Sequence, residues 1–294
     1  MRVFVTGATG FIGTPVVKDL IAAGHQVLGM ARSDEGANAI SAFGAEVLRG
    51  SLEDLDSLRK GATASDAVIH LGFVHDWSNF AKSCEIDRCA IEALGSVLAG
   101  SDRPLIVTGG LAGLAGAGQL AIETQMISPD FPFPRVSEQT ALSLKGVRAS
   151  VMRLPQVHDP VRQGLITPLI EVYRAKGACA YVGDGQNRWP AAHVLDVARL
   201  YRLAIEQAEP NARYHAVAEE GVPMREIAEA IGRRLTLPAK SIAPQEAEAF
   251  FGWLGTFAAY DMPASSAQTR KKLGWEPVGP GLIADLDQLA YSAQ

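Results

Sequence analysis

The chain has 294 residues, of which 48% are hydrophobic, and its formal net charge is −5 at pH 7. A chain of this length can bury a large core as one domain or one and a half. The acidic balance argues against nucleic acid as a main partner, because phosphates attract basic surfaces.

Three further features concern the compartment and metal binding. Cys84, Cys89 and Cys179 lack the spacing of a metal site and indicate free thiols. No apolar run reaches membrane-spanning length, and the first strand begins too early for a signal peptide. We therefore expect a cytoplasmic protein with no metal and no membrane partner.

The strongest motif lies at the N-terminus, where an apolar strand at 3–5 runs into Gly7, Gly10 and Gly13. Gly7 allows a tight turn, Gly10 lets the backbone approach a pyrophosphate, and Gly13 lets the next helix pack closely on the strand. The helix N-terminus adds free N–H groups and a positive dipole end. This context favours a dinucleotide site over a plain tight turn. The residues expected around the phosphates are Gly7, Thr9, Gly10, Phe11, Ile12 and Gly13.

Strands and helices alternate after this motif as far as residue 155. Strands are expected at 26–31, 45–48, 66–72, 104–108 and 149–154, and helices at about 34–43, 79–98 and 136–144, with another opening at 51–54. This rhythm predicts parallel strands joined by right-handed crossovers. Continuous apolar runs fit strands covered on both faces. The predicted fold class is α/β, with a doubly wound parallel sheet in a dinucleotide-binding domain at 1–155.

The second half of the chain has a different character. A loop rich in Gly, Ala and Pro at 109–134 is long enough to be a functional loop. Helices then dominate, at about 165–176, 193–207, 223–235, 245–250 and 265–273, with short strands at 178–182, 213–217 and 241–243. We expect 156–294 to form mainly a smaller, mostly helical substrate-binding lobe, with the strand near 213–217 returning to the sheet.

Segments along the whole chain carry a family resemblance. They are Thr6-Gly7-x-x-Gly10-x-x-Gly13, Asp66–Leu71, Arg153-Leu154-Pro155, Gly183-Asp184-Gly185, His193–Ala198 and Leu273-Gly274-Trp275-x-Pro277. With them the chain resembles the extended short-chain dehydrogenases/reductases, an NAD-dependent epimerase/dehydratase-like superfamily that includes nucleotide-sugar epimerases and hydroxysteroid dehydrogenases. The resemblance implies a Rossmann-like sheet, a nicotinamide dinucleotide, and a second lobe that closes over the nicotinamide and holds the substrate.

The chain departs from this superfamily at the catalytic pair. These enzymes normally carry Tyr-x-x-x-Lys, in which the lysine lowers the pKa of the tyrosine so that it can exchange a proton with the substrate. Counting back from Glu138, which resembles the glutamate of the following helix, places the tyrosine near Asp130 and the lysine near Pro134. Thr108-Gly109-Gly110 also stands where Thr-Ser-Gly or Ser-Ser is expected. The chain is therefore similar to the atypical members, and its mechanism stays open.

Arg32 follows the second strand, at the position where NAD-preferring relatives carry an acidic residue that binds the ribose hydroxyls. An arginine there can pair bidentately with a 2′-phosphate, so NADP(H) is expected and NAD is the weaker alternative. An exposed loop arginine is the plain alternative. The ends of other strands face the same crevice. They contribute Ser51 and Leu52 beside the adenine, Leu71, Gly72 and Phe73 beneath the ribose and pyrophosphate, and Pro155 after the sixth strand.

Candidates for proton transfer follow three of the strands. Thr108 ends the fifth strand, His75 follows the fourth, and His158 lies on a loop after the sixth. Histidine titrates in the useful pH range, although either ring can equally be a surface or structural group. Arg188 and Trp189 occupy the stretch with which related enzymes reach the substrate, and bridging the lobes is their structural alternative.

The leading prediction is an NADP(H)-dependent oxidoreductase that reduces a small carbonyl compound, or catalyses the reverse reaction. A non-catalytic NADP-binding sensor or regulatory protein is the alternative, supported by the missing tyrosine and lysine. A sugar-nucleotide epimerase or dehydratase is a third, weakened because those enzymes use the tyrosine and hold NAD. The resemblance also admits a homodimer through the helices at 79–98 and 136–144.

Overall fold

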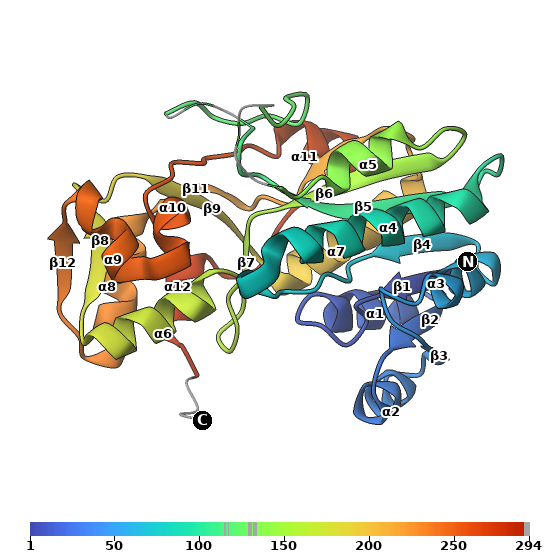
Figure 1. Cartoon of the computed structure of the whole chain (residues 1–294), viewed down its shortest axis with the longest axis horizontal. Helices are drawn as coiled ribbons and strands as arrows, with labels where there is room; N and C mark the ends of the chain where they lie inside the picture. Colours follow the sequence, from blue (N-terminus) through green and yellow to red (C-terminus); the bar gives the residue numbers. More distant parts are fainter. Residues whose placement is uncertain (115, 117, 129–130, 132–133, 291–294) are drawn as a thin grey trace.

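The computed structural model describes residues 1–294 except 115, 117, 129–130, 132–133 and 291–294, and it divides into two lobes (Figure 1). The larger lobe is built on a seven-stranded sheet in the order β10-β6-β5-β4-β1-β2-β3. Every pair of neighbouring strands in it is parallel. The strands are β1 (Arg2–Thr6), β2 (Gln26–Ala31), β3 (Glu46–Arg49), β4 (Ala67–His70), β5 (Pro104–Gly110), β6 (Arg148–Leu154) and β10 (Arg213–His215).

This order makes the fold a Rossmann-like, doubly wound α/β fold, as the sequence predicts. The strand order reverses between β1 and β4, so the crevice for a ligand opens beyond the carboxyl ends of these two strands. The segment near 213–217 does return to the sheet, where β10 pairs in parallel with β6.

Helices cover both faces of the sheet. One face carries α1 (Gly13–Ala22), α2 (Asp34–Ala42), α7 (Val194–Gln207) and α11 (Ala267–Leu273), and the other carries α3 (Leu55–Thr63), α4 (Phe80–Leu98) and α5 (Ser137–Ser143). In β1, Val3 and Val5 belong to the core on the α1 face, while Phe4 belongs to the core on the α3 face. Such strands read as continuous apolar runs because both faces are buried.

The smaller lobe has its own apolar core. A three-stranded sheet, in the order β11-β9-β7, contains β7 (Gln156–His158), β9 (Arg188–His193) and β11 (Glu219–Pro223), and a two-stranded sheet pairs β8 (Cys179–Val182) with β12 (Ala239–Ile242). The helices are α6 (Ile166–Lys176), α8 (Met224–Leu235), α9 (Ala247–Phe251), α10 (Gly255–Ala258) and α12 (Leu282–Asp287), with short 3₁₀ turns η2 (Pro244–Glu246) and η3 (Gly252–Leu254).

The smaller lobe corrects part of the sequence prediction. The three-stranded sheet was not anticipated, because its strands are short and β9 contains Pro190 and two alanines. The prediction also started a helix at His193, whereas His193 is the last residue of β9 and its ring caps α7 by accepting from the Leu195 N–H. The lobe therefore contains this small sheet in addition to the expected helices and short strands.

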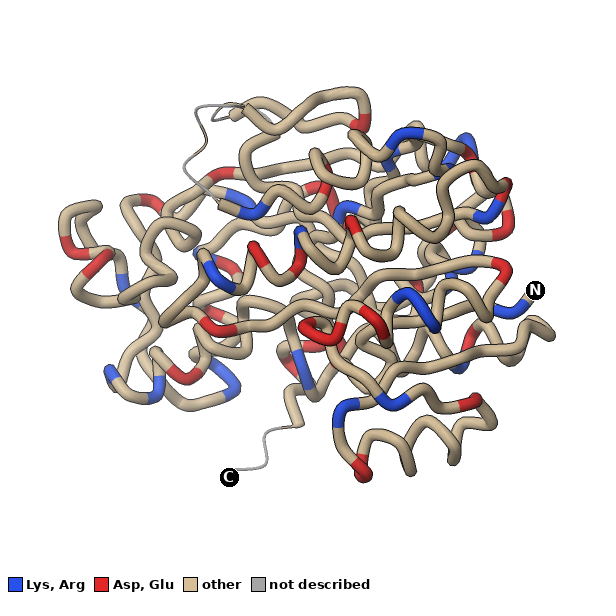
Figure 2. Tube along the Cα trace, turned by 45° about the vertical axis from the view of Figure 1, so that its right-hand side comes forward, with Lys and Arg blue, Asp and Glu red and all other residues tan. Residues whose placement is uncertain are grey.

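Basic and acidic residues form no large patch of one sign along the described part of the chain. Figure 2 shows Lys and Arg interspersed with Asp and Glu over both lobes. All three cysteines have free thiols. Among the described residues, no group of His, Cys, Asp or Glu has the arrangement of a metal site, and no helix has the length and apolarity needed to cross a membrane.

A buried ion pair ties α5 to two strands of the large sheet. Arg153 on β6 has no solvent exposure and donates through Nε to Glu138 Oε2 at 2.7 Å. Arg213 on β10 donates to Glu138 Oε1 at 3.0 Å. Burial and the Arg153 charge lower the pKa of His215 to about 4, so its neutral Nε2 accepts from Arg153 Nη1 at 3.0 Å. Glu138 thus compensates two arginines at once.

Replacing Glu138 with glutamine should destabilise the fold by about 3–5 kcal/mol, because it leaves Arg153 buried without its carboxylate. Glu92, which pairs with Arg88 on the exposed face of α4, is the matched control. Glu92→Gln should leave the thermal midpoint nearly unchanged, since exposed pairs contribute little. Equal midpoints for the two variants in thermal unfolding would contradict this assignment.

Candidate functional site

The glycine-rich turn after β1 builds the floor of the crevice. Gly7 has φ +67°, and a Cβ there would lie 2.8 Å from the Gly72 N atom at the end of β4. A Cβ on Gly13 would overlap the Gly7 carbonyl oxygen, so the first turn of α1 packs directly on the loop. Gly10 differs, because a Cβ there would meet just one atom within 4 Å among the described residues beyond its chain neighbours, the Gly7 oxygen at 3.1 Å, and the residue is exposed. Protein atoms therefore leave open the space in front of Gly10 that a pyrophosphate requires.

The other residues of this loop lie around the same opening. Thr9 is exposed and its methyl group lies close to Gly36, at the start of α2. Phe11 and Ile12 are half-buried and pack against the core beneath α1. From the smaller lobe, the Arg162 guanidinium lies 5.9 Å from the centre of the Phe11 ring. A cation of the second lobe therefore stands beside the predicted phosphate loop.

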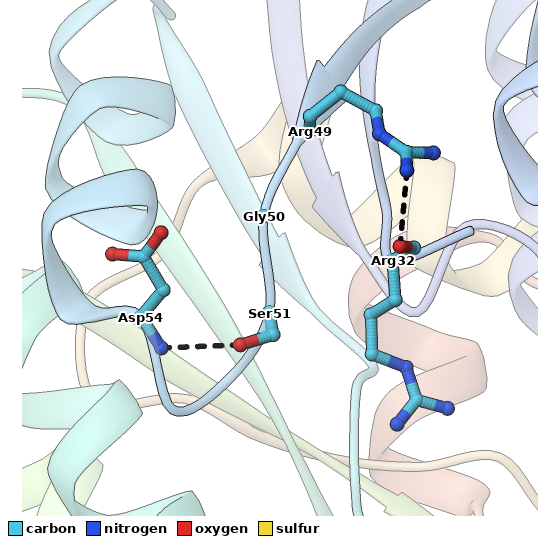
Figure 3. A pocket seen from close by; sticks show the side chains of 5 residues that line it. All are labelled: Arg32, Arg49, Gly50, Ser51 and Asp54. Carbon is cyan, nitrogen blue, oxygen red and sulfur yellow. Dashed lines mark hydrogen bonds between the residues drawn. The ribbon is translucent and has the colours of Figure 1, made fainter. Parts of the chain in front are cut away.

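A pocket lies at the ends of β2 and β3, where the sequence predicts the adenine, and it is lined by Arg32, Arg49, Gly50, Ser51 and Asp54 (Figure 3). Arg32 is exposed, and its guanidinium makes no hydrogen bond or ion pair within the part of the chain that the structure describes. Arg49, which the sequence analysis missed, donates to the Arg32 carbonyl oxygen at 3.2 Å and pairs with Asp34 at 3.1 Å. Two arginines therefore reach one pocket, and one of them is uncommitted.

Ser51 and Leu52 lie where the sequence predicts. Ser51 is half-buried in the pocket and its hydroxyl accepts from the Asp54 N–H at 3.2 Å. Leu52 is buried, and its methyl groups lie against Gly72. Leu71 and Phe73 are half-buried on either side of Gly72. The ends of β3 and β4 thus meet at one wall of the crevice.

Beneath this wall, buried hydrogen bonds connect β1, β4 and α4. The Thr6 hydroxyl accepts from the Gly72 N–H at 3.0 Å and lies 2.8 Å from His70 Nδ1. The other ring nitrogen of His70, Nε2, lies 3.2 Å from Asp87 Oδ1. Because a carboxylate can only accept, Nε2 donates to Asp87, and the tautomer with its hydrogen on Nε2 leaves Nδ1 to accept from Thr6. This fixes the backbone of Gly72 from below.

The same chain of hydrogen bonds continues to an arginine at the crevice. Ser137 donates to Asp87 Oδ2 at 2.5 Å and accepts from Arg135 Nε at 2.8 Å. Burial opposes the charged form of Asp87, but the hydrogen bond from His70, together with Ser137 and the Arg135 charge, holds its pKa below the ordinary value. Arg135 Nη2 also donates to the Thr108 carbonyl oxygen at 3.0 Å. Asp87 is therefore an ionised anchor for Arg135.

Arg135 is the main functional candidate that the sequence analysis missed. Its guanidinium lies over the Phe73 ring, 4.3 Å from the centroid, so it reaches the wall formed by the end of β4. The available signal was its position, one residue after Pro134, where the lysine of the usual pair was expected. Pro134 itself is exposed, and Asp130 lies outside the described residues.

Of the predicted proton donors, His75 lies beside Phe73, whereas the Thr108 hydroxyl points into the core. His75 is at the crevice, with its ring 5.2 Å from that of Phe73. Desolvation and the Arg135 charge lower its pKa, so the ring is neutral near pH 7. Thr108 does end β5, but its hydroxyl donates inward to the His70 carbonyl oxygen at 2.7 Å and accepts from the buried Tyr201 hydroxyl at 2.8 Å. That hydroxyl has no proton left to donate to a substrate in this arrangement.

His158 is not on a loop facing the crevice, contrary to the expectation. It belongs to β7, has no solvent exposure, and its Nδ1 lies 2.6 Å from Asp285 on α12. Burial lowers its pKa and outweighs the opposing effect of Asp285. This geometry is that of a structural histidine in the core between β7 and α12.

Two residues expected at the substrate also turn inward. Trp189 is fully buried, and its Nε1 donates to the Phe257 carbonyl oxygen at 3.1 Å. Arg188 forms a two-pronged pair with Asp261, at 3.1 and 2.9 Å, and the resulting hydrogen bonds raise its pKa. Pro155 is half-buried between β6 and β7, at the junction of the lobes. Arg188 and Trp189 therefore stabilise the second lobe.

An aromatic contact spans the two lobes. Trp77, in the short 3₁₀ turn η1 (Trp77–Asn79) after β4, stacks on Trp253 of the smaller lobe, with centroids 4.0 Å apart and planes inclined by 16°. Trp77 also stacks on Phe80, and Phe80 neighbours Phe73. The segment that carries His75 is thus held from both sides by apolar rings.

Comparison with known proteins assigns the chain to a family. Residues 3–85 and 135–217, more than half of the chain, match the model of the NAD dependent epimerase/dehydratase family. The chain belongs to this family. The match omits 86–134, which contains the loop where the usual catalytic tyrosine is expected.

Individual relatives agree with the assignment. An uncharacterized protein of Schizosaccharomyces pombe is 46% identical over 99% of this chain and 100% of its own. The 2-alkyl-3-oxoalkanoate reductase of Stenotrophomonas maltophilia is 26% identical over 77% of this chain and 73% of its own. The dTDP-glucose 4,6-dehydratase of Streptomyces venezuelae, solved with NAD bound, has a TM-score of 0.76 at 16% identity and covers 98% of this chain and 95% of its own. Structural neighbours of this family member thus include a protein that binds NAD.

The glycine loop offers a pair of variants that separate binding from folding. Gly10→Val should abolish dinucleotide binding in calorimetry while leaving the thermal midpoint near that of the unmodified protein, because the side chain enters the open pyrophosphate space. Gly13→Ala should lower the midpoint itself, since its Cβ meets the Gly7 carbonyl oxygen. Retained binding by Gly10→Val would contradict the phosphate-loop assignment.

Proposed function

We propose that this family member is an NADP(H)-dependent reductase that acts on a small carbonyl compound. The observation that carries the proposal is the pocket beyond β2 and β3, where an uncommitted Arg32 stands beside Arg49. A second support is a wall on which an imidazole and a guanidinium both contact the Phe73 ring. The name of the Stenotrophomonas relative, a 3-oxoalkanoate reductase, agrees with a ketone substrate.

The residues present fit a dinucleotide phosphate. Gly10 leaves space for a pyrophosphate at the N-terminus of α1, where free N–H groups and the dipole favour anions. Leu52, Leu71 and Gly72 supply an apolar wall. Arg32 and Arg49 supply positive charge for a 2′-phosphate, and an arginine fork suits phosphate geometry. The bound nicotinamide would supply the hydride.

The chain's own residues have separate tasks in this proposal. Phe73 and Trp77 exclude water from one side of the reacting centre. The protonated form of His75, whose share grows as the pH falls, gives a proton to the carbonyl oxygen as hydride reaches the carbonyl carbon, so the ring becomes neutral and the product is an alcohol. Arg135 supplies a positive charge beside the reacting centre. The Thr6–His70–Asp87–Ser137 hydrogen bonds hold Gly72 and Arg135 in place.

A non-catalytic NADP-binding sensor is the second candidate. It is favoured by the inward-facing Thr108 hydroxyl and by a proline where the lysine is expected. Its distinguishing outcome is tight NADPH binding with no oxidation of NADPH by aldehydes, ketones or oxo acids. An epimerase or dehydratase would instead show tightly held NAD.

Arg32→Asp should weaken NADPH binding roughly 10- to 100-fold, since charge-assisted hydrogen bonds contribute about 1.5–3 kcal/mol. NADH affinity should stay constant or rise, because an acidic residue can bind the ribose hydroxyls. Titration calorimetry with both nucleotides measures the two affinities. Arg59→Asp, an exposed arginine on α3, is the control. Unchanged affinity of Arg32→Asp for both nucleotides would contradict the NADP assignment.

His75→Ala should lower turnover by about 10²–10⁴-fold with NADPH affinity nearly intact, as expected for loss of a general acid. Burial and the Arg135 charge lower the pKa of His75, so turnover of the unmodified protein should rise as the pH falls through that lowered pKa and the ring gains the proton it donates. The variant should lose this acidic limb. His25→Ala, whose ring pairs with Glu206 far from the crevice, should keep the limb. Identical pH profiles for both variants would remove His75 from the mechanism.

A further inference from the structure

Arg135 has unused hydrogen-bonding capacity at the crevice. A guanidinium carries about five N–H donors. The structure assigns the Nε donor to Ser137 and one Nη2 donor to the Thr108 carbonyl oxygen. The hydrogen bonds of Arg135 to described residues use only Nε and Nη2, which leaves Nη1 without one among them, and the side chain is half-buried. One edge of the guanidinium is therefore anchored, and the other edge is open.

The charge of Arg135 is also incompletely compensated. No carboxylate among the described residues lies within ion-pair distance of it. Asp87, whose pKa the Arg135 charge helps to lower, makes no direct hydrogen bond to it: Ser137 lies between them, and the other Asp87 oxygen accepts from His70. The neighbouring wall at 71–75 contains no acidic residue, and Asp76 turns its carboxylate to the N–H groups of Ser78 and Asn79. Within the described residues, the Arg135 guanidinium therefore has a positive charge and no ion-pair partner.

We propose that the open edge of Arg135 binds a carboxylate of the substrate, and that the preferred substrates are oxo acids. The inference rests on the proposed reductase function and narrows its substrate class. His75 and Arg135 both contact the Phe73 ring. The centroids of the His75 and Phe73 rings are 5.2 Å apart, and the guanidinium carbon of Arg135 lies 4.3 Å from the Phe73 centroid. A carbonyl at His75 and an anion at Arg135 must therefore be close together in one molecule. A short 3-oxo acid has this arrangement.

The anchoring explains why arginine, and not lysine, suits this position. The Ser137 and Thr108 contacts fix one edge of a rigid planar group, which leaves the other edge oriented for a two-pronged carboxylate. A lysine ammonium is a point charge that rotates freely and makes no such fork. Arg135→Lys therefore keeps the charge and loses the geometry.

Binding can be measured without turnover by loading the protein with NADP⁺. The probes are acetoacetate, 3-oxooctanoate and benzoylacetate, each compared with its methyl ester by calorimetry. The unmodified protein should bind at least one acid about tenfold or more tightly than its ester, as one charge-assisted pair implies. Arg135→Gln should remove this preference and leave ester binding unchanged, and Arg135→Lys should retain part of it. Arg225→Gln, an exposed arginine paired with Glu229, should behave as the unmodified protein.

A second readout does not depend on affinity. The Arg135 charge lowers the pKa of His75, so an anion bound at Arg135 should raise that pKa in an NMR titration of the ring, whereas an ester should not. The assignment is wrong if every acid binds no better than its ester, or if Arg135→Gln keeps the preference while folded. Failure of NADPH to bind the unmodified protein would instead overturn the proposed function.

Discussion

The buried chain of hydrogen bonds from Thr6 to Arg135 is the constraint on which the site depends. It begins at the carboxyl end of β1 and passes through His70 and Asp87 to Ser137. Each member is satisfied by the next, as buried polar networks require. Because the Asp87 carboxylate is an acceptor only, both His70 Nε2 and the Ser137 hydroxyl donate to it. The crevice therefore rests on a buried support anchored at Asp87.

This support positions two walls of the crevice together. At one end it holds the Gly72 N–H, and with it the backbone between Leu71 and Phe73. At the other end it holds the Arg135 guanidinium against Phe73 and the Thr108 carbonyl oxygen. The contact between Trp77 and Trp253 then connects this wall to the smaller lobe. Loop residues thus acquire fixed positions because buried groups of the sheet and helices hold them.

The sequence predicted the parts of the molecule that follow periodic rules. Buried parallel strands and a glycine loop between strand and helix are local patterns, and the structure confirms the doubly wound sheet. The short strands of the smaller lobe were missed, because Pro190 and its neighbouring alanines in β9 give no alternating pattern. The sequence also could not predict the direction in which the candidate side chains point. Thr108 and His158 were placed near the correct strands, but their partners Tyr201 and Asp285 are 93 and 127 residues away in the sequence.

Arg135 is a residue that the sequence analysis missed because its role depends on contacts that the sequence does not reveal. Counting back from Glu138 led to Pro134 as the expected lysine position. The motif gave no reason to consider the next residue, Arg135, as a cation that could stand in for the lysine. Only the contacts with Ser137, Thr108 and Phe73 identify it as a crevice residue. Arg135 therefore places a cation one residue after the position expected for the lysine of the usual pair.

The central claim, that this chain transfers hydride from NADPH to a carbonyl carbon, is tested most directly by isotope transfer. NADPH deuterated at nicotinamide C4 is incubated with the unmodified protein and a panel of ketones, aldehydes and 3-oxo acids, and the products are analysed by mass spectrometry. The account predicts an alcohol with one deuterium on the former carbonyl carbon, formed faster from NADPH than from NADH. Tight NADPH binding with no deuterium transferred to any compound would contradict it and identify a sensor.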